Sequence, residues 1–139
     1  MFHVRVNGER PDFRVFIDLL FGAGCNVDSD GDARSPSARD WAWLYLRERE
    51  ERSAAVEIQA CADDPGLFGI HSENPELATL AALYLLHRCG SILTHHGAPL
   101  DGATLESMHQ RFGAQLARAD ASHWHRSTTR TPYPTATDR

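Results

Sequence analysis

With 139 residues, 42% of them hydrophobic and 24% charged, the chain has the size and composition of one soluble globular domain. Its net charge of −5 argues against nucleic-acid binding, because neutralising phosphates requires a basic surface. The 14 basic residues are all arginine, which excludes lysine chemistry of the Schiff-base and P-loop kinds.

No apolar run is long enough to span a membrane, and the first residues lack the basic and apolar parts of a signal peptide. We therefore expect a cytoplasmic protein without a membrane partner. Three cysteines, Cys25, Cys61 and Cys89, are odd in number and far apart, so they form neither a disulfide framework nor a zinc motif. We expect them to be reduced.

The first part of the chain predicts a strand, a helix and a long loop. Residues 2–6 alternate between apolar and polar as a short strand does. Pro11 then opens a helical pattern whose apolar positions include Phe13, Phe16 and Leu19. Residues 26–40 are rich in Asp, Ser, Gly and Pro, which predicts an exposed loop.

The middle of the chain predicts consecutive strands joined by turns. In residues 41–47 the alternation puts Trp41, Trp43 and Tyr45 on one face of a strand. Charged residues 48–52 form the expected turn, and residues 55–60 form a partner strand. A second turn over residues 63–66 leads to a strand over residues 67–70.

The clearest element is a helix that begins after Asn74 and ends before Gly90. Asn74 is a good N-cap, Pro75 suits the first helical position, and Gly90 is a typical stop. Residues 77–86 are almost entirely apolar, which predicts a helix buried in the core.

Beyond the central helix, the pattern becomes weaker. Residues 91–94 predict a short strand, and residues 105–116 carry an amphipathic helical stripe that Asp101 or Thr104 would cap. Residues 120–139 contain many threonines and two prolines without apolar periodicity, which predicts a poorly ordered tail behind a single domain over residues 1–119. Because the strands are grouped, we expect an α+β fold. Its antiparallel sheet should have about four to five strands, with two to three helices mainly on one face.

Acidic residues in the expected loops and aromatic residues on one strand face form the candidate partner-binding site. Aromatic side chains provide buried contacts in protein interfaces, and acidic groups accelerate encounter with a basic partner. The candidates are Asp28, Asp30, Asp32, Trp41, Trp43, Tyr45, Glu48, Glu50, Glu51, Asp63 and Asp64. The alternative, that the tryptophans belong to the core, stays open because the sequence does not reveal which strand face is buried.

Metal and catalytic sites have weaker patterns. Asp28, Asp30 and Asp32 resemble the start of a calcium loop, but Arg39 stands where an EF-hand needs glutamate. Adjacent histidines on an extended segment, such as His95 and His96, point to opposite sides. The other histidine pair, at positions 123 and 125, lies in the expected tail. We therefore expect no metal site and no cofactor.

A catalytic nucleophile would be Cys89 or Ser91 with His87, but neither has a recognisable signature around it. A buried structural thiol is the favoured interpretation of Cys89. We therefore expect that the chain is not an enzyme.

Several segments over residues 2–93 resemble small cytoplasmic immunity proteins encoded beside bacterial polymorphic toxins. They are Val4-Arg5-Val6-Asn7-Gly8-Glu9, Trp43-Leu44-Tyr45, Val56-Glu57-Ile58, Asp63-Asp64-Pro65 and Ala82-Leu83-Tyr84-Leu85-Leu86 before Gly90. The resemblance implies a non-enzymatic protein that binds one cognate toxin domain and occludes its active site. It carries over no functional residue, so the acidic candidates rest on charge alone.

Three functions therefore compete. The first is an immunity protein for a basic toxin domain. The second is a small-ligand-binding or regulatory domain with a pocket between sheet and helices. The third is a metal-dependent enzyme that uses His95, His96 and nearby acids.

Overall fold

The computed structural model describes residues 1–50 and 54–135, which form an α+β fold around one antiparallel sheet. Over these residues there are seven strands and four α-helices, more than the sequence predicted. The strands are β1 (Phe2–Val6), β2 (Val27–Gly31), β3 (Trp43–Glu48), β4 (Ala55–Cys61), β5 (Asp64–His71), β6 (Gly90–His95) and β7 (Ala98–Pro99). The helices are α1 (Arg14–Leu20), α2 (Pro75–Cys89), α3 (Gly102–Arg111), α4 (Gly113–Asp120) and a 3-10 turn, η1 (His123–Arg126).

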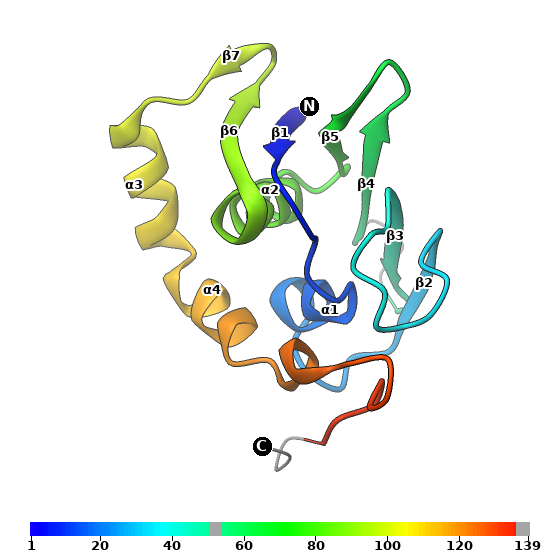
Figure 1. Cartoon of the computed structure of the whole chain (residues 1–139). Coiled ribbons are helices and arrows are strands. Elements are labelled where there is room, and N and C mark those ends of the chain that lie inside the picture. The colour runs from blue at the N-terminus through cyan, green and yellow to red at the C-terminus, as the bar shows by residue number, and fades with distance from the viewer. Residues whose placement is uncertain (51–53, 136–139) are drawn as a thin grey trace.

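The sheet places the first strand near its middle. Its order is β2-β3-β4-β5-β1-β6-β7, and every neighbouring pair is antiparallel. In Figure 1 the strands lie along the top and right of the molecule, and the four helices lie at its centre and left. β2 therefore forms one edge of the sheet, far from β7 at the other edge.

The central helix α2 is confirmed as the main core element. The Asn74 side chain accepts hydrogen bonds from the backbone N–H groups of Glu76 and Leu77, so the predicted N-cap is present. Leu83, Tyr84 and Leu85 are fully buried, and α2 packs against β1, β6 and α1. No helix in the described residues has both the length and the apolar character needed to cross a membrane.

Gly90 ends α2 for a reason that the sequence did not reveal. Its φ of −106° is extended, so left-handed backbone is not what requires glycine here. A Cβ at this position would lie 2.6 Å from Val4 Cγ1 and 2.8 Å from Leu86 Cα. Glycine allows the chain to pass from α2 directly into β6 beside β1.

Several predicted elements differ in the structure. The turn expected over residues 63–66 is shorter, because β5 already begins at Asp64. Residues 26–40 were expected to be a loop, but β2 pairs with β3 from Val27 to Gly31. The prediction was wrong because an edge strand with one exposed side needs little apolar alternation. The single helix expected over residues 105–116 is divided at Phe112 into α3 and α4, although Asp101 caps α3 as predicted.

The segment after α4 also differs from the expected tail. Residues 120–135 pack across α1, where Ser122 Oγ donates to Asp18 and Ser127 Oγ donates to Asp12. The Arg14 guanidinium lies over the Trp124 ring, 3.9 Å from its centre. Polar contacts and this cation–π contact hold the segment, so apolar periodicity was not needed to order it.

Candidate functional site

The sheet surface that faces away from α2 carries four of the eleven candidate side chains, and we call it the open face. These four are Asp28, Asp30, Trp43 and Tyr45. On β3, Leu44 and Leu46 point into the core, whereas Trp43, Tyr45 and Arg47 point to the open face and are half-buried. Alternation along a strand produces this separation. The predicted strand face is thus confirmed for Trp43 and Tyr45.

One row of side chains crosses four strands on the open face. The register pairs Tyr45 of β3 with Asp30 of β2 on one side and with Glu57 of β4 on the other. Glu57 in turn pairs with His71 of β5. We call Asp30, Tyr45, Glu57 and His71 the Tyr45 row. An aromatic ring therefore lies between two carboxylates.

Trp43 lies beside this row and is held in place by it. The Trp43 indole Nε1 donates to Glu57 Oε2 over 3.0 Å. Asp32, which follows β2, accepts from the backbone N–H groups of Ala42 and Trp43 at 2.9 and 3.0 Å. These bonds fix the start of β3 and the orientation of the indole ring.

The carboxylates of the open face differ in how their charge is compensated. Asp28 contacts Arg49 at 2.6 Å and Arg47 at 3.6 Å, and the Arg49 hydrogen bond lowers the pKa of Asp28. By contrast, Asp30, Asp32 and Glu57 form no ion pair with any residue that the structure describes. Their recorded donors are neutral N–H groups. The negative charge around Trp43 and Tyr45 is therefore available to a partner.

Trp41 does not belong to this surface, and its predicted place beside Trp43 is wrong. Only 1% of its surface is exposed, its Nε1 donates to the Pro11 carbonyl, and its ring meets Phe16 and Phe68 edge to face. The strand begins only at Trp43, so alternation does not extend back to Trp41. For this tryptophan the core alternative is correct.

The remaining acidic candidates lie in two other places. Glu48 and Glu50 lie at the far end of β3, where the Glu50 N–H donates to Glu48. Asp63 and Asp64 lie at the β4–β5 turn, and Asp64 forms two 2.8 Å bonds with Arg5 of β1 that lower its pKa. Glu51 lies outside the described residues. The acidic candidates therefore do not form one continuous patch.

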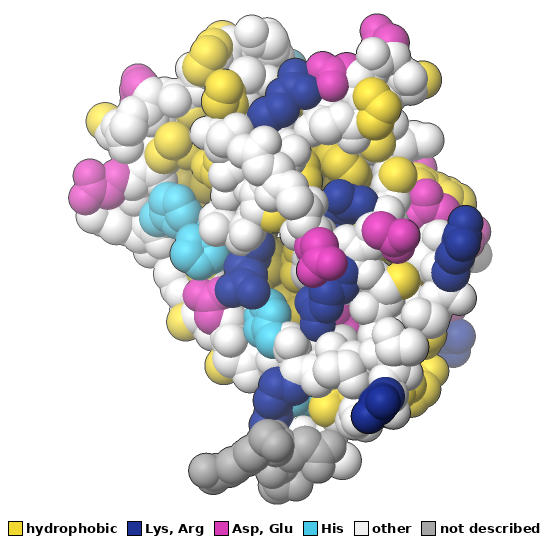
Figure 2. Space-filling view, in the orientation of Figure 1, with side chains coloured by type: hydrophobic (Ala, Val, Ile, Leu, Met, Phe, Trp, Pro, Cys, Tyr) yellow, Lys and Arg dark blue, Asp and Glu magenta, His cyan; other side chains and the backbone are white. Residues whose placement is uncertain are grey.

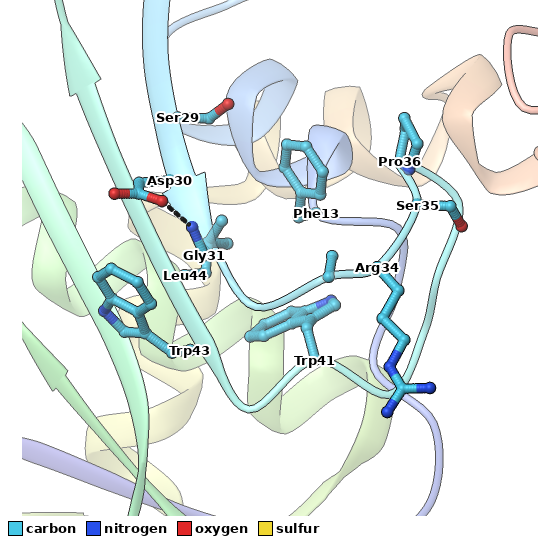
Figure 3. A pocket seen from close by; sticks show the side chains of 11 residues that line it. Phe13, Ser29, Asp30, Gly31, Arg34, Ser35, Pro36, Trp41, Trp43 and Leu44 are labelled. Carbon is cyan, nitrogen blue, oxygen red and sulfur yellow. Dashed lines mark hydrogen bonds between the residues drawn. The ribbon is translucent and has the colours of Figure 1, made fainter.

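A cavity of about 290 Å³ lies at the edge of the sheet next to β2. Phe13, which immediately precedes α1, lines the cavity together with Trp41 and Leu44. Its other lining residues are Ser29, Asp30, Gly31, Ala33, Arg34, Ser35, Pro36 and Trp43. Figure 3 shows Phe13 and Trp41 on one side of β2 and β3, with Asp30 and Trp43 pointing the other way. The edge strand thus has an apolar side and an acidic side.

The histidines nominated for a metal are engaged in other contacts. His96 has a positive φ of 52°, so its ring lies 4.0 Å from the His95 ring instead of on the opposite side. His123 stacks on Trp124, and His125 Nε2 lies 2.8 Å from the Ala119 carbonyl oxygen. Within residues 1–50 and 54–135, no group of three or more His, Cys, Asp or Glu residues is placed to hold a metal ion.

Sequence reasoning missed a second polar cluster, formed where α2, α4 and η1 meet. Tyr84 Oη lies 3.0 Å from His125 Nε2, and His87 Nε2 lies 3.5 Å from Asp120. Burial raises the pKa of Tyr84 and lowers the pKa of His125. Figure 2 shows histidine, arginine and acidic side chains gathered on this face, beside α3 and α4. The histidine spacing gave no signal, because these residues come from separate elements.

Comparison of the chain with protein-family models, curated proteins and solved structures finds no match.

Proposed function

We propose that this chain is a non-enzymatic binding protein that neutralises a bacterial toxin domain by covering its active site, as an immunity protein does. The partner carries basic residues around its active site, as a nuclease with a basic substrate groove does. The open face around Tyr45 binds that basic surface.

The observation that carries this proposal is the Tyr45 row. Tyr45 lies between the carboxylates of Asp30 and Glu57, and neither carboxylate has an ion-pair partner in the described residues. A guanidinium or ammonium group of a partner can lie over the Tyr45 or Trp43 ring and bond to the adjacent carboxylates. Half-buried aromatic rings in a fixed orientation lose little conformational entropy on binding.

Capture of the partner tests the proposal. The tagged full chain is incubated with lysate of the source cells, washed with salt, and the retained polypeptides are identified by mass spectrometry. We expect one stoichiometric polypeptide that arrests growth when it is expressed alone.

Two variants link the captured polypeptide to the open face. The tagged variants Asp30→Arg and Tyr45→Ala should no longer capture the polypeptide, whereas Glu106→Arg should still capture it. Glu106 is an exposed residue of α3, so its replacement changes the net charge as Asp30→Arg does at a distant place. Equal capture by all four proteins would contradict the open face as the binding site.

A further inference from the structure

The outer edge of β2 has backbone groups that no described strand uses. Arg49 N donates to Asn26 O, and Asp32 N donates to Trp43 O. In an antiparallel pair the residues that bond to the neighbouring strand alternate along the chain. Asp28 and Asp30 therefore bond to β3, whereas the N–H and C=O groups of Val27, Ser29 and Gly31 point away from the sheet. The Gly31 N–H already donates to Asp30 Oδ1 over 2.8 Å, so Ser29 is the central residue of this edge for a further strand.

This edge is accessible along most of its length. Ser29, Asp30 and Gly31 are exposed, and β2 is the last strand on its side of the sheet in the described residues. Figure 1 shows β2 at the right of the sheet, with the β2–β3 connection curving around its end. A free edge with unpaired backbone groups is a template for one more strand.

The two sides of this edge differ in chemistry. Ser29 is in register with buried Leu46, so the Ser29 side chain lies on the face of β2 that borders Phe13, Trp41 and Leu44 in the cavity. Asp30 is in register with Tyr45, so the Asp30 carboxylate lies on the open face. A strand added to β2 would place alternate side chains beside the apolar cavity and beside the acidic side.

A second copy of this chain does not fit this edge well. Antiparallel pairing of two β2 strands around Ser29 would put Asp28 of each copy opposite Asp30 of the other. Like charges placed directly opposite one another destabilise a strand pair. The edge is instead complementary to a strand with basic residues.

We propose that β2 binds an extended segment of the partner as an additional antiparallel strand in which basic and apolar residues alternate. This proposal rests on the proposed function and specifies how the partner is recognised. Apolar side chains of the segment enter the cavity beside Trp41. The backbone N–H and C=O groups of these same residues bond to Ser29 and its outward-facing neighbours. Basic side chains of the segment lie beside Asp30 on the open face.

The test uses a short blocked peptide in which arginine and valine alternate, labelled for fluorescence anisotropy, with the purified full chain. In the proposed register the valines supply the N–H groups that reach β2, and the arginine N–H groups point away. N-methylation of the valines should weaken binding about tenfold or more, because it removes the hydrogen bonds that their N–H groups donate to β2. N-methylation of the arginines should leave binding unchanged.

Variants of the protein test the same hydrogen bonds as the methylated peptides do. Ser29→Pro removes an outward N–H that β3 does not use and should weaken peptide binding about tenfold, whereas Ser29→Ala should not. The peptide variants keep the test valid if proline disturbs β2. Equal binding by both methylated peptides, loss only with methylated arginines, or no binding of the parent peptide would overturn the proposal. In each of these cases, retention of the partner in the capture experiment would leave the proposed function standing.

Discussion

At the scale of single residues, close packing explains features that residue type alone does not. Gly90 is required by the approach of Val4 and Leu86, not by an unusual backbone angle. Gly31 is similar, because a Cβ there would lie 2.6 Å from the Trp43 carbonyl oxygen. Both glycines lie where one element passes very near the backbone or side chain of another.

Gly90→Ala should lower the free energy of unfolding by about 1–3 kcal/mol, the usual cost of adding a methyl group to a packed site. Urea denaturation of both proteins measures the difference. Gly102→Ala is the matched control, because no heavy atom lies within 4 Å of its Cβ position. A stability of Gly90→Ala equal to that of the control would show that the α2–β6 junction relaxes without cost.

His125 should make stability depend on pH. Burial lowers its pKa in the folded chain, so the unfolded chain binds more protons as the pH falls below the ordinary value of about 6.5. The stability associated with neutral His125 is fully present above that pH and is lost as the pH falls through and below it. His125 faces Tyr84, Asp120, Arg39 and Arg88, and the two arginines oppose its protonation.

The free energy of unfolding should therefore decrease between about pH 7 and pH 5, and less steeply in His125→Gln. Urea denaturation at several pH values measures both slopes. His95, whose pKa is also lowered, contributes the same background to both proteins. Identical slopes would mean that His125 titrates normally in the folded chain.

At the scale of elements, α2 supports the sheet and is where the sequence was most informative. The sequence predicted its cap, its first proline and its almost entirely apolar character, because these features act within one helix. β2 was missed because its residues are polar and its pairing with β3 depends on a distant strand. A break such as the one between α3 and α4 also depends on tertiary contacts.

Leu80→Ala and Leu85→Ala should each destabilise the chain by about 2–5 kcal/mol, as truncation of fully packed leucines does. Both side chains are buried, with 3% and 0% of their surfaces exposed. Leu86→Ala at a partly exposed position of the same helix should cost less. Thermal or urea denaturation distinguishes the variants, and near wild-type stability of the first two would remove α2 from the core.

At the scale of the whole molecule, the described C-terminal residues complete the structure around α1. Asp12 is fully buried and Asp18 is 7% exposed, and serines of the C-terminal segment supply hydrogen bonds to both. The sequence pointed to a tail because it contains little apolar periodicity, whereas these contacts are polar. The same limit applies to the candidate site: its residues could be nominated, but their grouping required the register of the strands.

A chain that ends at Ala121 should be less stable by about 3 kcal/mol or more, because two buried carboxylates lose hydrogen bonds. Urea denaturation of the shortened chain measures this loss. Ser122→Ala together with Ser127→Ala, which keeps the backbone of the segment, should reproduce a large part of it. Unchanged stability after truncation would contradict a structural role for the segment.

The central claim is that the open face neutralises a toxin. Its most direct test is growth of a bacterial host that expresses the captured polypeptide together with the wild-type chain, Asp30→Arg, Tyr45→Ala or Glu106→Arg. We expect arrest by the polypeptide alone, rescue by wild type and Glu106→Arg, and failure of the two open-face variants at equal expression. Rescue by all four proteins would contradict the open-face site, and rescue by none would contradict neutralisation itself.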